Sequence, residues 1–395
     1  MPIMPHPIIH TRDIKLPLNE SLFLFGPRGV GKTSLLRSFA SDAIYIDLLD
    51  DDIYRRLLNQ PTRLREWTDL AKDGQRIVID EVQKIPALLD EVHLQIESKK
   101  RIFILTGSSA RKLKASSVNL LAGRAETHFL HPLTAHELQG AFNLKRALIN
   151  GLLPKAYAAE NPQPFLASYV KTYLKEEVQQ EGLTRNLGSF SKFLEAASFS
   201  QSLTLNYSAI ATDTGISRRT IQSYFDLVED LLLGIRLPVF AKRAKREMSS
   251  HPKFFFFDTG VFRTLRPKGP LDRPEEIEGA ALETLVFQDL QAVNNYFNLG
   301  YQLYYWRTSA HQEVDFVLYG ERGIIAIEVK RSNRIRPEDL AGLTLFSEDY
   351  PTATRILLHG GHETTCRNGI LLFPLDKWFS ESFTILSENQ PQKSR

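Results

Sequence analysis

Short apolar segments alternate with helix-compatible stretches through the first third of the chain. Between positions 86 and 96, leucine, valine and isoleucine recur at three-to-four spacing. Strands that alternate with helices predict an α/β fold with a parallel sheet, whose binding site lies at the carboxyl ends of the strands. We assign this sheet to residues 1–132. The apolar segments expected to form its strands are 22–25, 44–48, 77–79 and 102–105.

The pattern becomes helical beyond Pro132. Residues 134–202 read as helices, with a turn near 151–154 and a strongly patterned helix over 165–178. We interpret 133–202 as a helical lid that follows the sheet.

Two short helices joined by a glycine-containing turn are predicted next. Residues 207–211 form the first helix, 213–216 the turn and 218–232 the second helix, with Ser217 as its N-cap. Strands over 234–237 and 252–257 then flank a basic loop, which makes 203–270 a winged helix. The basic residues at the expected contact positions are Arg218, Arg219, Lys242, Arg243, Lys245 and Arg246.

Such a helix can enter the major groove of DNA with its N-terminal residues, so we expect these side chains to contact nucleic acid. A winged helix also serves as a protein-contact or packing module, and that alternative stays open. A basic run considered alone is as often a solvated loop as a nucleic-acid contact.

The last segment, 271–395, has a pattern typical of a metal-dependent nuclease fold. A helix over 277–293 carries Glu283, and a strand follows at 301–306. Residues 313–318 and 324–330 then form a hairpin that brings Asp315 close to Glu328 and Lys330. Two acids that bind Mg²⁺ and a lysine that orients hydroxide suit phosphodiester cleavage. Such a fold is also retained for binding or structure alone.

The most specific chemistry lies between the first strand and the first helix. Gly26, Gly31, Lys32 and Thr33 fill the fixed positions of the phosphate-loop pattern G-x-x-x-x-G-K-[ST]. Backbone N–H groups of such a loop close around a polyphosphate, the lysine reaches its β and γ phosphates, and the threonine hydroxyl ligates Mg²⁺. The expected nucleotide contacts are Gly26, Pro27, Arg28, Gly29, Val30, Gly31, Lys32, Thr33 and Ser34.

Two carboxylates end the strand over 77–79. Asp80 is expected to hold Mg²⁺ together with Thr33, and Glu81 to act as the base that polarises water. Thr106 or Ser108, at the end of the next strand, is expected to sense the γ-phosphate or position the water. An arginine of the basic segment 110–124, which contains Arg111 and Arg124, is a candidate arginine finger for a neighbouring subunit, although a local salt bridge explains it equally well.

Composition adds few constraints. The 395 residues are 43% hydrophobic and 24% charged with a net charge of +3, which is typical of a globular protein with two or three domains. No apolar run approaches the roughly 20 residues of a membrane span, and the N-terminus lacks the pattern of a signal peptide. The single cysteine, Cys366, excludes an intramolecular disulfide framework. We therefore expect a cytoplasmic protein without membrane contact.

Taken together, the motifs resemble the bacterial and archaeal AAA-type ATPases that carry a C-terminal restriction-endonuclease-like, PD-(D/E)xK, domain. The likeness rests on motifs in matching order over about residues 13–375: the phosphate loop, Ile79-Asp80-Glu81-Val82-Gln83, Leu105-Thr106-Gly107-Ser108-Ser109, Gly123-Arg124, Glu283, Glu313-Val314-Asp315-Phe316 and Ile327-Glu328-Val329-Lys330.

The resemblance implies an AAA-type core that hydrolyses ATP with Mg²⁺ in a homo-oligomer, commonly a hexameric ring. It favours Arg124 over Arg111 as the finger supplied by the next subunit. We expect an ATPase that binds and remodels or translocates DNA, including branched, four-way junction DNA. The alternatives are a nucleotide-dependent switch that recognises a protein partner and an ATP-regulated, Mg²⁺-dependent nuclease.

Overall fold

The computed structural model describes residues 11–109, 120–173, 178, 186–270 and 272–388. The chain divides into two compact units. Unit 1 contains residues 1–132 with 230–233, and unit 2 contains 133–229 with 234–395. Each unit is described by itself.

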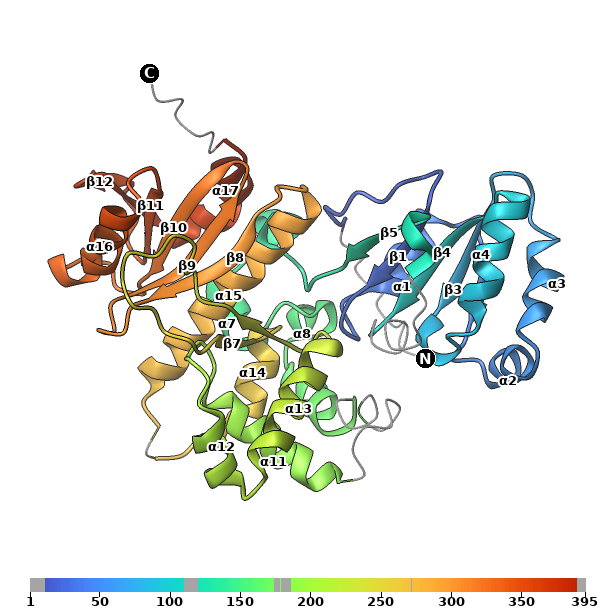
Figure 1. The fold of residues 1–395 in the computed structure, drawn as a ribbon, viewed down its shortest axis with the longest axis horizontal. Helices are drawn as coiled ribbons and strands as arrows, with labels where there is room; N and C mark the ends of the chain where they lie inside the picture. The colour runs from blue at the N-terminus through green and yellow to red at the C-terminus, as the bar shows by residue number, and fades with distance from the viewer. Residues whose placement is uncertain (1–10, 110–119, 174–177, 179–185, 271, 389–395) are drawn as a thin grey trace. The chain divides into compact units, whose positions relative to one another are not determined.

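The core of unit 1 is a five-stranded parallel sheet in the order β2-β3-β4-β1-β5 (Figure 1). The expected parallel α/β sheet is thereby confirmed. Because β4 lies between β1 and β3, the residues that follow β4 lie between the segments that follow the other two strands. The strands are β1 (Ser21–Phe25), β2 (Ile44–Asp47), β3 (Arg76–Asp80), β4 (Ile102–Gly107) and β5 (Ala125–Phe129).

Helices cover this sheet through an apolar core. Leu57, Leu89 and Val92 pack with strand residues such as Phe23 and Ile79, and all five are fully buried. The helices are α1 (Lys32–Phe39), α2 (Asp51–Asn59), α3 (Leu64–Thr68) and α4 (Leu88–Lys99), with 3₁₀ turns at Pro61–Arg63, Val82–Lys84 and Leu120–Gly123.

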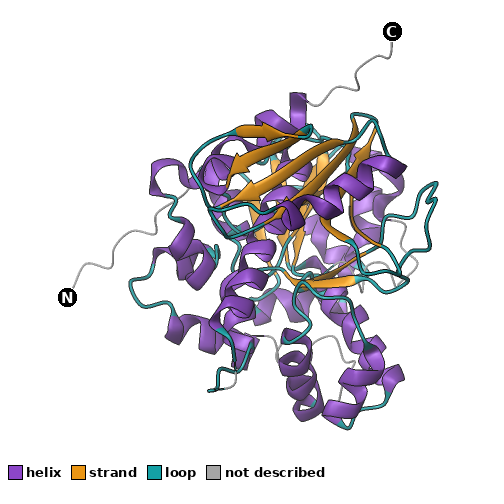
Figure 2. Cartoon of the chain, turned by 90° about the vertical axis from the view of Figure 1, so that its left-hand side faces the viewer, coloured by secondary structure: helices purple, strands orange, loops and turns teal. Residues whose placement is uncertain are grey.

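Unit 2 contains a six-stranded mixed sheet in the order β12-β13-β11-β10-β9-β8, which lies among helices in Figure 2. The predicted hairpin is present: β9 and β10 pair antiparallel, and Gly320 lies opposite Gly323 at its turn. The strands are β8 (Gln302–Arg307), β9 (Glu313–Gly320), β10 (Gly323–Val329), β11 (Thr354–His359), β12 (Thr365–Arg367) and β13 (Ile370–Pro374).

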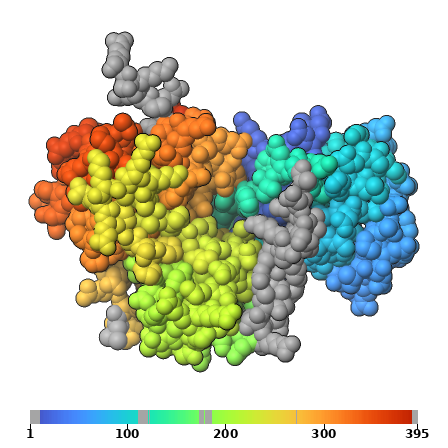
Figure 3. Space-filling model, in the orientation of Figure 1, coloured from blue at the N-terminus to red at the C-terminus, as the bar shows by residue number. Residues whose placement is uncertain are grey.

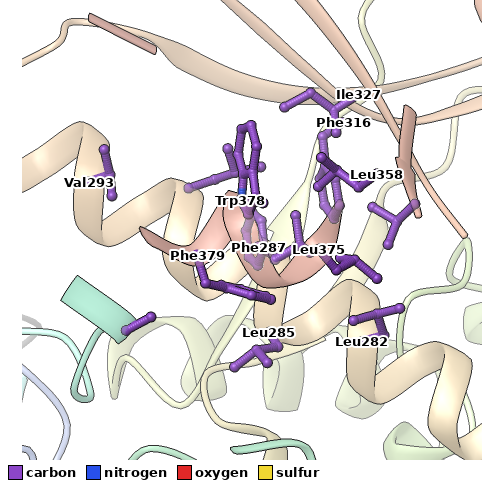
Figure 4. Close-up of a cluster of buried hydrophobic side chains, with 14 of the residues drawn as sticks. Leu282, Leu285, Phe287, Val293, Phe316, Ile327, Leu358, Leu375, Trp378 and Phe379 are labelled. Atoms are coloured by element: carbon purple, nitrogen blue, oxygen red, sulfur yellow. The ribbon is translucent and has the colours of Figure 1, made fainter. Parts of the chain in front are cut away.

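Helices α15 (Pro274–Tyr296) and α17 (Leu375–Glu388) contribute to the main core of this sheet. Their side chains, including Phe287 and Trp378, interdigitate with Phe316 of β9 and Leu358 of β11 (Figure 4). A second cluster contains Phe346 of α16 (Ala341–Asp349), Phe240 and Trp306. The 3₁₀ turn Pro337–Leu340 precedes α16.

Residues 133–229 and 234–270 build the helical remainder of unit 2. A two-stranded antiparallel sheet of β6 (Gly234–Leu237) and β7 (Lys253–Phe256) follows the pair α12 (Tyr207–Thr214) and α13 (Arg218–Asp230). The other helices are α6 (Ala135–Leu138), α7 (Leu144–Asn150), α8 (Pro154–Ala158), α9 (Gln163–Ser168), α11 (Leu187–Ser198) and α14 (Thr259–Leu265), with a 3₁₀ turn at Gln139–Ala141.

The helix expected over 165–178 differs from the prediction. Helix α9 ends at Ser168, and Tyr169–Tyr173 continue as a π-helical segment, a form that inserts an extra residue into a turn. Hydrophobic spacing cannot distinguish the two forms over so short a length. The end of the predicted helix, apart from residue 178, lies outside the described residues.

The three segments predicted after residue 132 pack as one unit. Asp258, at the start of α14, accepts a hydrogen bond from Leu152 N at 2.7 Å, and Thr259 Oγ1 donates to Ala147 O at 2.7 Å. Gly151 has a φ of +74°, and a Cβ there would lie 2.1 Å from the Asp258 carboxylate. The domain boundaries that we predict at residues 202 and 270 fall inside a single compact unit. They therefore stay predictions.

Among the described residues, no helix combines the length and the apolar composition that crossing a bilayer requires.

Candidate functional site

The phosphate-loop residues connect β1 directly to α1, as the sequence predicts. Gly29 and Gly31 have φ values of +85° and +101°, a backbone conformation that favours glycine. A Cβ on Gly26 would lie 2.4 Å from the Leu130 carbonyl oxygen, so the close approach of that backbone requires glycine. The loop conformation is thus specified by its own glycines.

Lys32 lies folded over this loop. Its buried ammonium donates to the carbonyl oxygens of Gly26 at 2.7 Å and Pro27 at 3.3 Å. Pro27 and Val30 are buried, Arg28 and Thr33 are partly exposed, and Gly29 and Ser34 are exposed. A ligand at the loop can therefore reach both backbone and side-chain groups.

Arg12 supports the loop from a distance along the chain. It donates to Val30 O at 2.8 Å and to His131 O at 2.5 Å. We did not predict this role from the sequence, since a single arginine 18 positions before Val30 matches no motif.

Asp80 is the point where the loop meets the sheet. Thr33 Oγ1 donates to Asp80 Oδ2 at 3.1 Å, and the hydroxyls of Tyr45 and Thr106 donate to the same carboxylate. Burial and the neighbouring Asp80 raise the pKa of the Tyr45 phenol well above its usual value. Tyr45 was not predicted, because its position depends on the pairing of β2 with β3.

Glu81 has a left-handed backbone conformation, with φ of +59°. The Gln83 amide donates to Glu81 Oε2 and, at 3.1 Å, to Ser108 Oγ. Ser108 N and Oγ each lie 3.4 Å from Glu81 Oε2. Of the two candidates at the end of β4, Ser108 thus lies against Glu81 and Thr106 against Asp80. Gln83 belongs to this site although we assigned it no role.

The residues fit MgATP. The Thr33 hydroxyl and the Asp80 carboxylate are hard oxygen ligands at one locus, and the loop offers the backbone donors that a polyphosphate needs. Within the described residues, no group of three or more histidine, cysteine or acidic side chains is arranged to hold a metal alone. A magnesium ion here would therefore depend on phosphate oxygens of the nucleotide.

Arg124 forms an ion pair with Glu97 of α4 within its own unit. The Arg124 hydrogen bond lowers the pKa of Glu97. The local salt bridge is therefore present, and the role of finger stays a prediction. Its rival, Arg111, lies outside the described residues.

Arg218 and Arg219 begin helix α13, after the Gly215 turn, whose φ is +70°. Both are exposed. Neither forms an ion pair with another described residue. They are thus available to a ligand, and the assignment of a winged helix to these elements stays a prediction.

The basic run is largely engaged within unit 2. It lies at the surface beside the C-terminal sheet, in yellow in Figure 3. Arg246 Nε lies 3.2 Å from Asp349 Oδ2, and Lys245 Nζ donates to Glu348 O at 3.2 Å. The Lys242 ammonium lies 4.1 Å from the centroid of the Tyr319 ring. Arg243 is exposed with φ of +53°.

The predicted acidic cluster comes together. Lys330 Nζ donates to Glu328 Oε1 at 2.6 Å, and Asp315 Oδ2 accepts from Val329 N at 2.9 Å. Burial, and then the charge of Asp315, raises the pKa of both Glu283 and Glu328 to about 8.

Two further residues that we did not predict complete the cluster. Lys253 of β7 lies 3.3 Å from Asp315 and 3.6 Å from Glu283, and it also pairs with Glu313. The only sequence signal for Lys253 is its position as a lone charge before four phenylalanines. That signal does not indicate a contact with Asp315, which lies 62 positions further along the chain.

Comparison with known proteins finds a family match that covers most of the first unit. Residues 18–139 match the model of the AAA domain family, so this part of the chain is similar to AAA-type domains. Residues 141–272 match a domain of unknown function, DUF8612, and residues 278–378 match another, DUF4143.

Relatives that match most of the chain are named uncharacterized proteins. Proteins of Mycobacterium tuberculosis and Mycobacterium bovis are each 26% identical over 343 residues, covering 82% of this chain and 75% of theirs. A protein of Haemophilus influenzae is 21% identical over 387 residues, covering 89% of this chain and 92% of its own. The crystal structure of protein VC1899 from Vibrio cholerae covers 89% of this chain and 100% of its own, at 14% identity and a TM-score of 0.22. That score supports no argument.

Proposed function

We propose that the chain binds MgATP at residues 26–33 and hydrolyses it with Asp80 and Glu81. The observation that carries the proposal is the 3.1 Å hydrogen bond from Thr33 Oγ1 to Asp80 Oδ2. It joins two segments 47 positions apart, each bearing an oxygen ligand that a phosphate-loop ATPase uses for Mg²⁺.

In this proposal each residue has a defined task. Loop N–H groups and the start of α1 hold the phosphates, and the Lys32 ammonium exchanges the Gly26 and Pro27 carbonyls for phosphate oxygens. Bound Mg²⁺ supplies neutralisation of phosphate charge. Glu81 accepts a proton from the attacking water, while Gln83 and Ser108 fix the orientation of its carboxylate.

Nucleotide binding by Lys32→Ala tests the assignment of the loop. We expect the variant to lose detectable binding of a fluorescent ATP analogue, because no other described side chain combines a buried ammonium with the loop carbonyls. Lys72→Ala removes an exposed lysine of the same unit and should bind like the wild type. Equal affinity of both variants would contradict the proposal.

We further propose that ATP turnover acts on DNA, including branched four-way junctions. The exposed pair Arg218 and Arg219 at the start of α13 supports this, since N-terminal residues of a second helix contact DNA in helix-turn-helix proteins. Single-stranded, duplex and junction DNA should be compared for stimulation of ATP hydrolysis. Replacing both arginines with alanine should abolish stimulation, and Lys192→Ala, at an exposed position of α11, should not. No stimulation by any DNA would reject this part.

The proposed assembly is a homo-oligomer, in ring form, in which Arg124 serves the neighbouring site. Subunit mixing tests this directly. Arg124→Ala and Glu81→Gln proteins should each be inactive, and their mixture should recover activity where an intact Arg124 faces an intact Glu81. No recovery would assign Arg124 to its local pair with Glu97.

A second candidate is a nucleotide-dependent switch that recognises a protein partner. The internal contacts of Lys242, Lys245 and Arg246 favour it, because cations engaged in this way are less available to phosphates. The salt dependence of DNA affinity separates the two. Phosphate contacts give a steep loss of DNA affinity with rising salt. A switch that does not contact DNA should show no specific DNA binding at any salt concentration.

A further inference from the structure

Lys253 is a buried cation among carboxylates from two elements. The residue is 2% exposed on β7, and its ammonium faces Glu283 of α15 together with Glu313 and Asp315 of β9. A buried ammonium requires compensation by opposite charge. The three carboxylates provide it, and burial is outweighed by their charges, which raise the pKa of Lys253 above its usual value.

This arrangement conflicts with the divalent metal that a D…ExK cluster implies. Mg²⁺ and Ca²⁺ need carboxylate oxygens at about 2.0–2.6 Å around an open centre. Here Asp315 Oδ1 faces the Lys253 ammonium at 3.3 Å, and its other oxygen accepts the Val329 N–H at 2.9 Å. Both oxygens of the central aspartate are therefore already engaged.

The remaining carboxylates point to the same conclusion. Glu313 also pairs with Arg307 at 3.0 Å, and Glu328 pairs with Lys330 at 2.6 Å. Glu283 Oε2 and Glu328 Oε2 are buried and have no hydrogen-bond partner among the described residues, and Glu283 Oε2 lies 3.6 Å from the Lys253 ammonium. The cluster thus has two carboxylate oxygens without a hydrogen bond, while a lysine lies where Glu283, Glu313 and Asp315 converge.

We propose that Lys253 is the resident cation of this cluster and excludes divalent metal from Glu283, Asp315 and Glu328. The wild-type chain then performs no metal-dependent DNA cleavage through Asp315, and the ion pairs fasten β7 to β9 and α15. Removing the ammonium leaves Glu283 and Asp315 without their cation, which creates a divalent-metal site. The inference goes beyond the proposed ATPase and does not depend on it.

Manganese binding to the nucleotide-free full chain, followed by the electron paramagnetic resonance of free Mn²⁺, tests the proposal. Wild type and Asp315→Asn should bind the same amount of Mn²⁺, because any Mn²⁺ that the wild type binds is held at another site. Lys253→Met keeps the length and apolar stem of the side chain and should gain one site, which Lys253→Met/Asp315→Asn should lack. Lys242→Met, at a lysine stacked on Tyr319, is the matched control and should gain none.

Two results would overturn the proposal. One is wild-type Mn²⁺ binding, or Mg²⁺-dependent DNA cutting, that disappears in Asp315→Asn. The other is a folded Lys253→Met protein that gains no Mn²⁺ site. The variant leaves the Glu283 and Asp315 carboxylates without their ion-pair partner, which can prevent folding. The comparison of wild type with Asp315→Asn then decides alone: equal binding supports the proposal and unequal binding rejects it.

Discussion

At the scale of single residues, the phosphate loop depends on where a methyl group can fit. A Cβ on Gly26 would lie 2.4 Å from the Leu130 carbonyl, and a peptide oxygen has no flexible end that can move aside. At Gly279 in α15 nothing lies within 4 Å, so the same substitution meets open space.

Gly26→Ala and Gly279→Ala should therefore change stability in opposite directions. We expect Gly26→Ala to lower the free energy of unfolding by about 1–3 kcal/mol through overpacking. Gly279→Ala should raise it by about 0.5–1 kcal/mol, because alanine restricts the unfolded chain and suits a helix. Urea unfolding of both variants measures this, and equal shifts would contradict the loop geometry.

Tyr45 offers a second test at this scale. Its hydroxyl donates to the buried Asp80 carboxylate, and a hydrogen bond to a charged group contributes about 1.5–3 kcal/mol. Tyr45→Phe should lose a comparable amount of unfolding free energy. Tyr54→Phe is the matched control, because its ring contacts Lys84 while its hydroxyl forms no hydrogen bond with the described residues. A similar effect of both changes would indicate that the Asp80 contact contributes nothing.

The sequence predicted the site where its residues are adjacent and failed where they are distant. Gly26 to Thr33 and Asp80-Glu81 form local motifs whose spacing carries the chemistry. Tyr45 approaches Asp80 through strand register, and Lys253 approaches Asp315 across 62 positions. Hydrophobic patterns specify which face of an element is buried, but not which side chain lies opposite.

At the scale of elements, α15 and α17 enclose an unusual carboxyl group. Asp289 of α15 is 5% exposed, and burial raises its pKa to about 7, while nearby Ser382, Trp378 and His136 lower it. The protonated form is thus favoured in the folded state. Stability from this group is fully present below the unfolded pKa of about 3.9 and is lost as pH rises through 7.

Asp289→Asn should remove this pH dependence. Between pH 5 and pH 8 the wild type should lose about 2–3 kcal/mol of unfolding free energy at this group, and the neutral amide should not. Urea unfolding at a series of pH values gives the two slopes. Parallel slopes would mean that Asp289 stays ionised in the folded chain.

The basic run connects its loop to the end of α16. Arg246 pairs with Asp349, whose side chain is only 3% exposed, whereas Arg243 is exposed. Arg246→Ala should destabilise the protein by about 1–3 kcal/mol, because it leaves a buried carboxylate without its partner. Arg243→Ala should change stability little. Thermal unfolding of the pair measures this, and equal melting temperatures would contradict a structural role for Arg246.

Element prediction was most successful where patterns are long. The parallel sheet of unit 1, helix α15 and the β9–β10 hairpin were anticipated. The π-helical residues 169–173 were not, since a one-residue insertion disturbs hydrophobic spacing too little to detect over one turn.

At the scale of the whole molecule, the first unit is similar to AAA-type domains, and the second unit matches two domain families of unknown function. We predicted separate lid, winged-helix and nuclease-like segments, and the second unit packs them together through contacts such as Asp258 with Leu152. Such long-range contacts cannot be predicted from composition or from the positions of turn-forming residues along the chain. The inactive metal cluster that we infer is a consequence of the same packing, because Lys253 belongs to one segment and Asp315 to another.

ATP hydrolysis by the Glu81→Gln variant tests the central claim most directly. The measurement is phosphate release at saturating MgATP, with nucleotide binding recorded in parallel. Our account predicts unchanged binding and a turnover rate that falls by about 100-fold or more, because the amide cannot accept a proton from water. A variant that binds ATP and hydrolyses it at the wild-type rate would contradict the account.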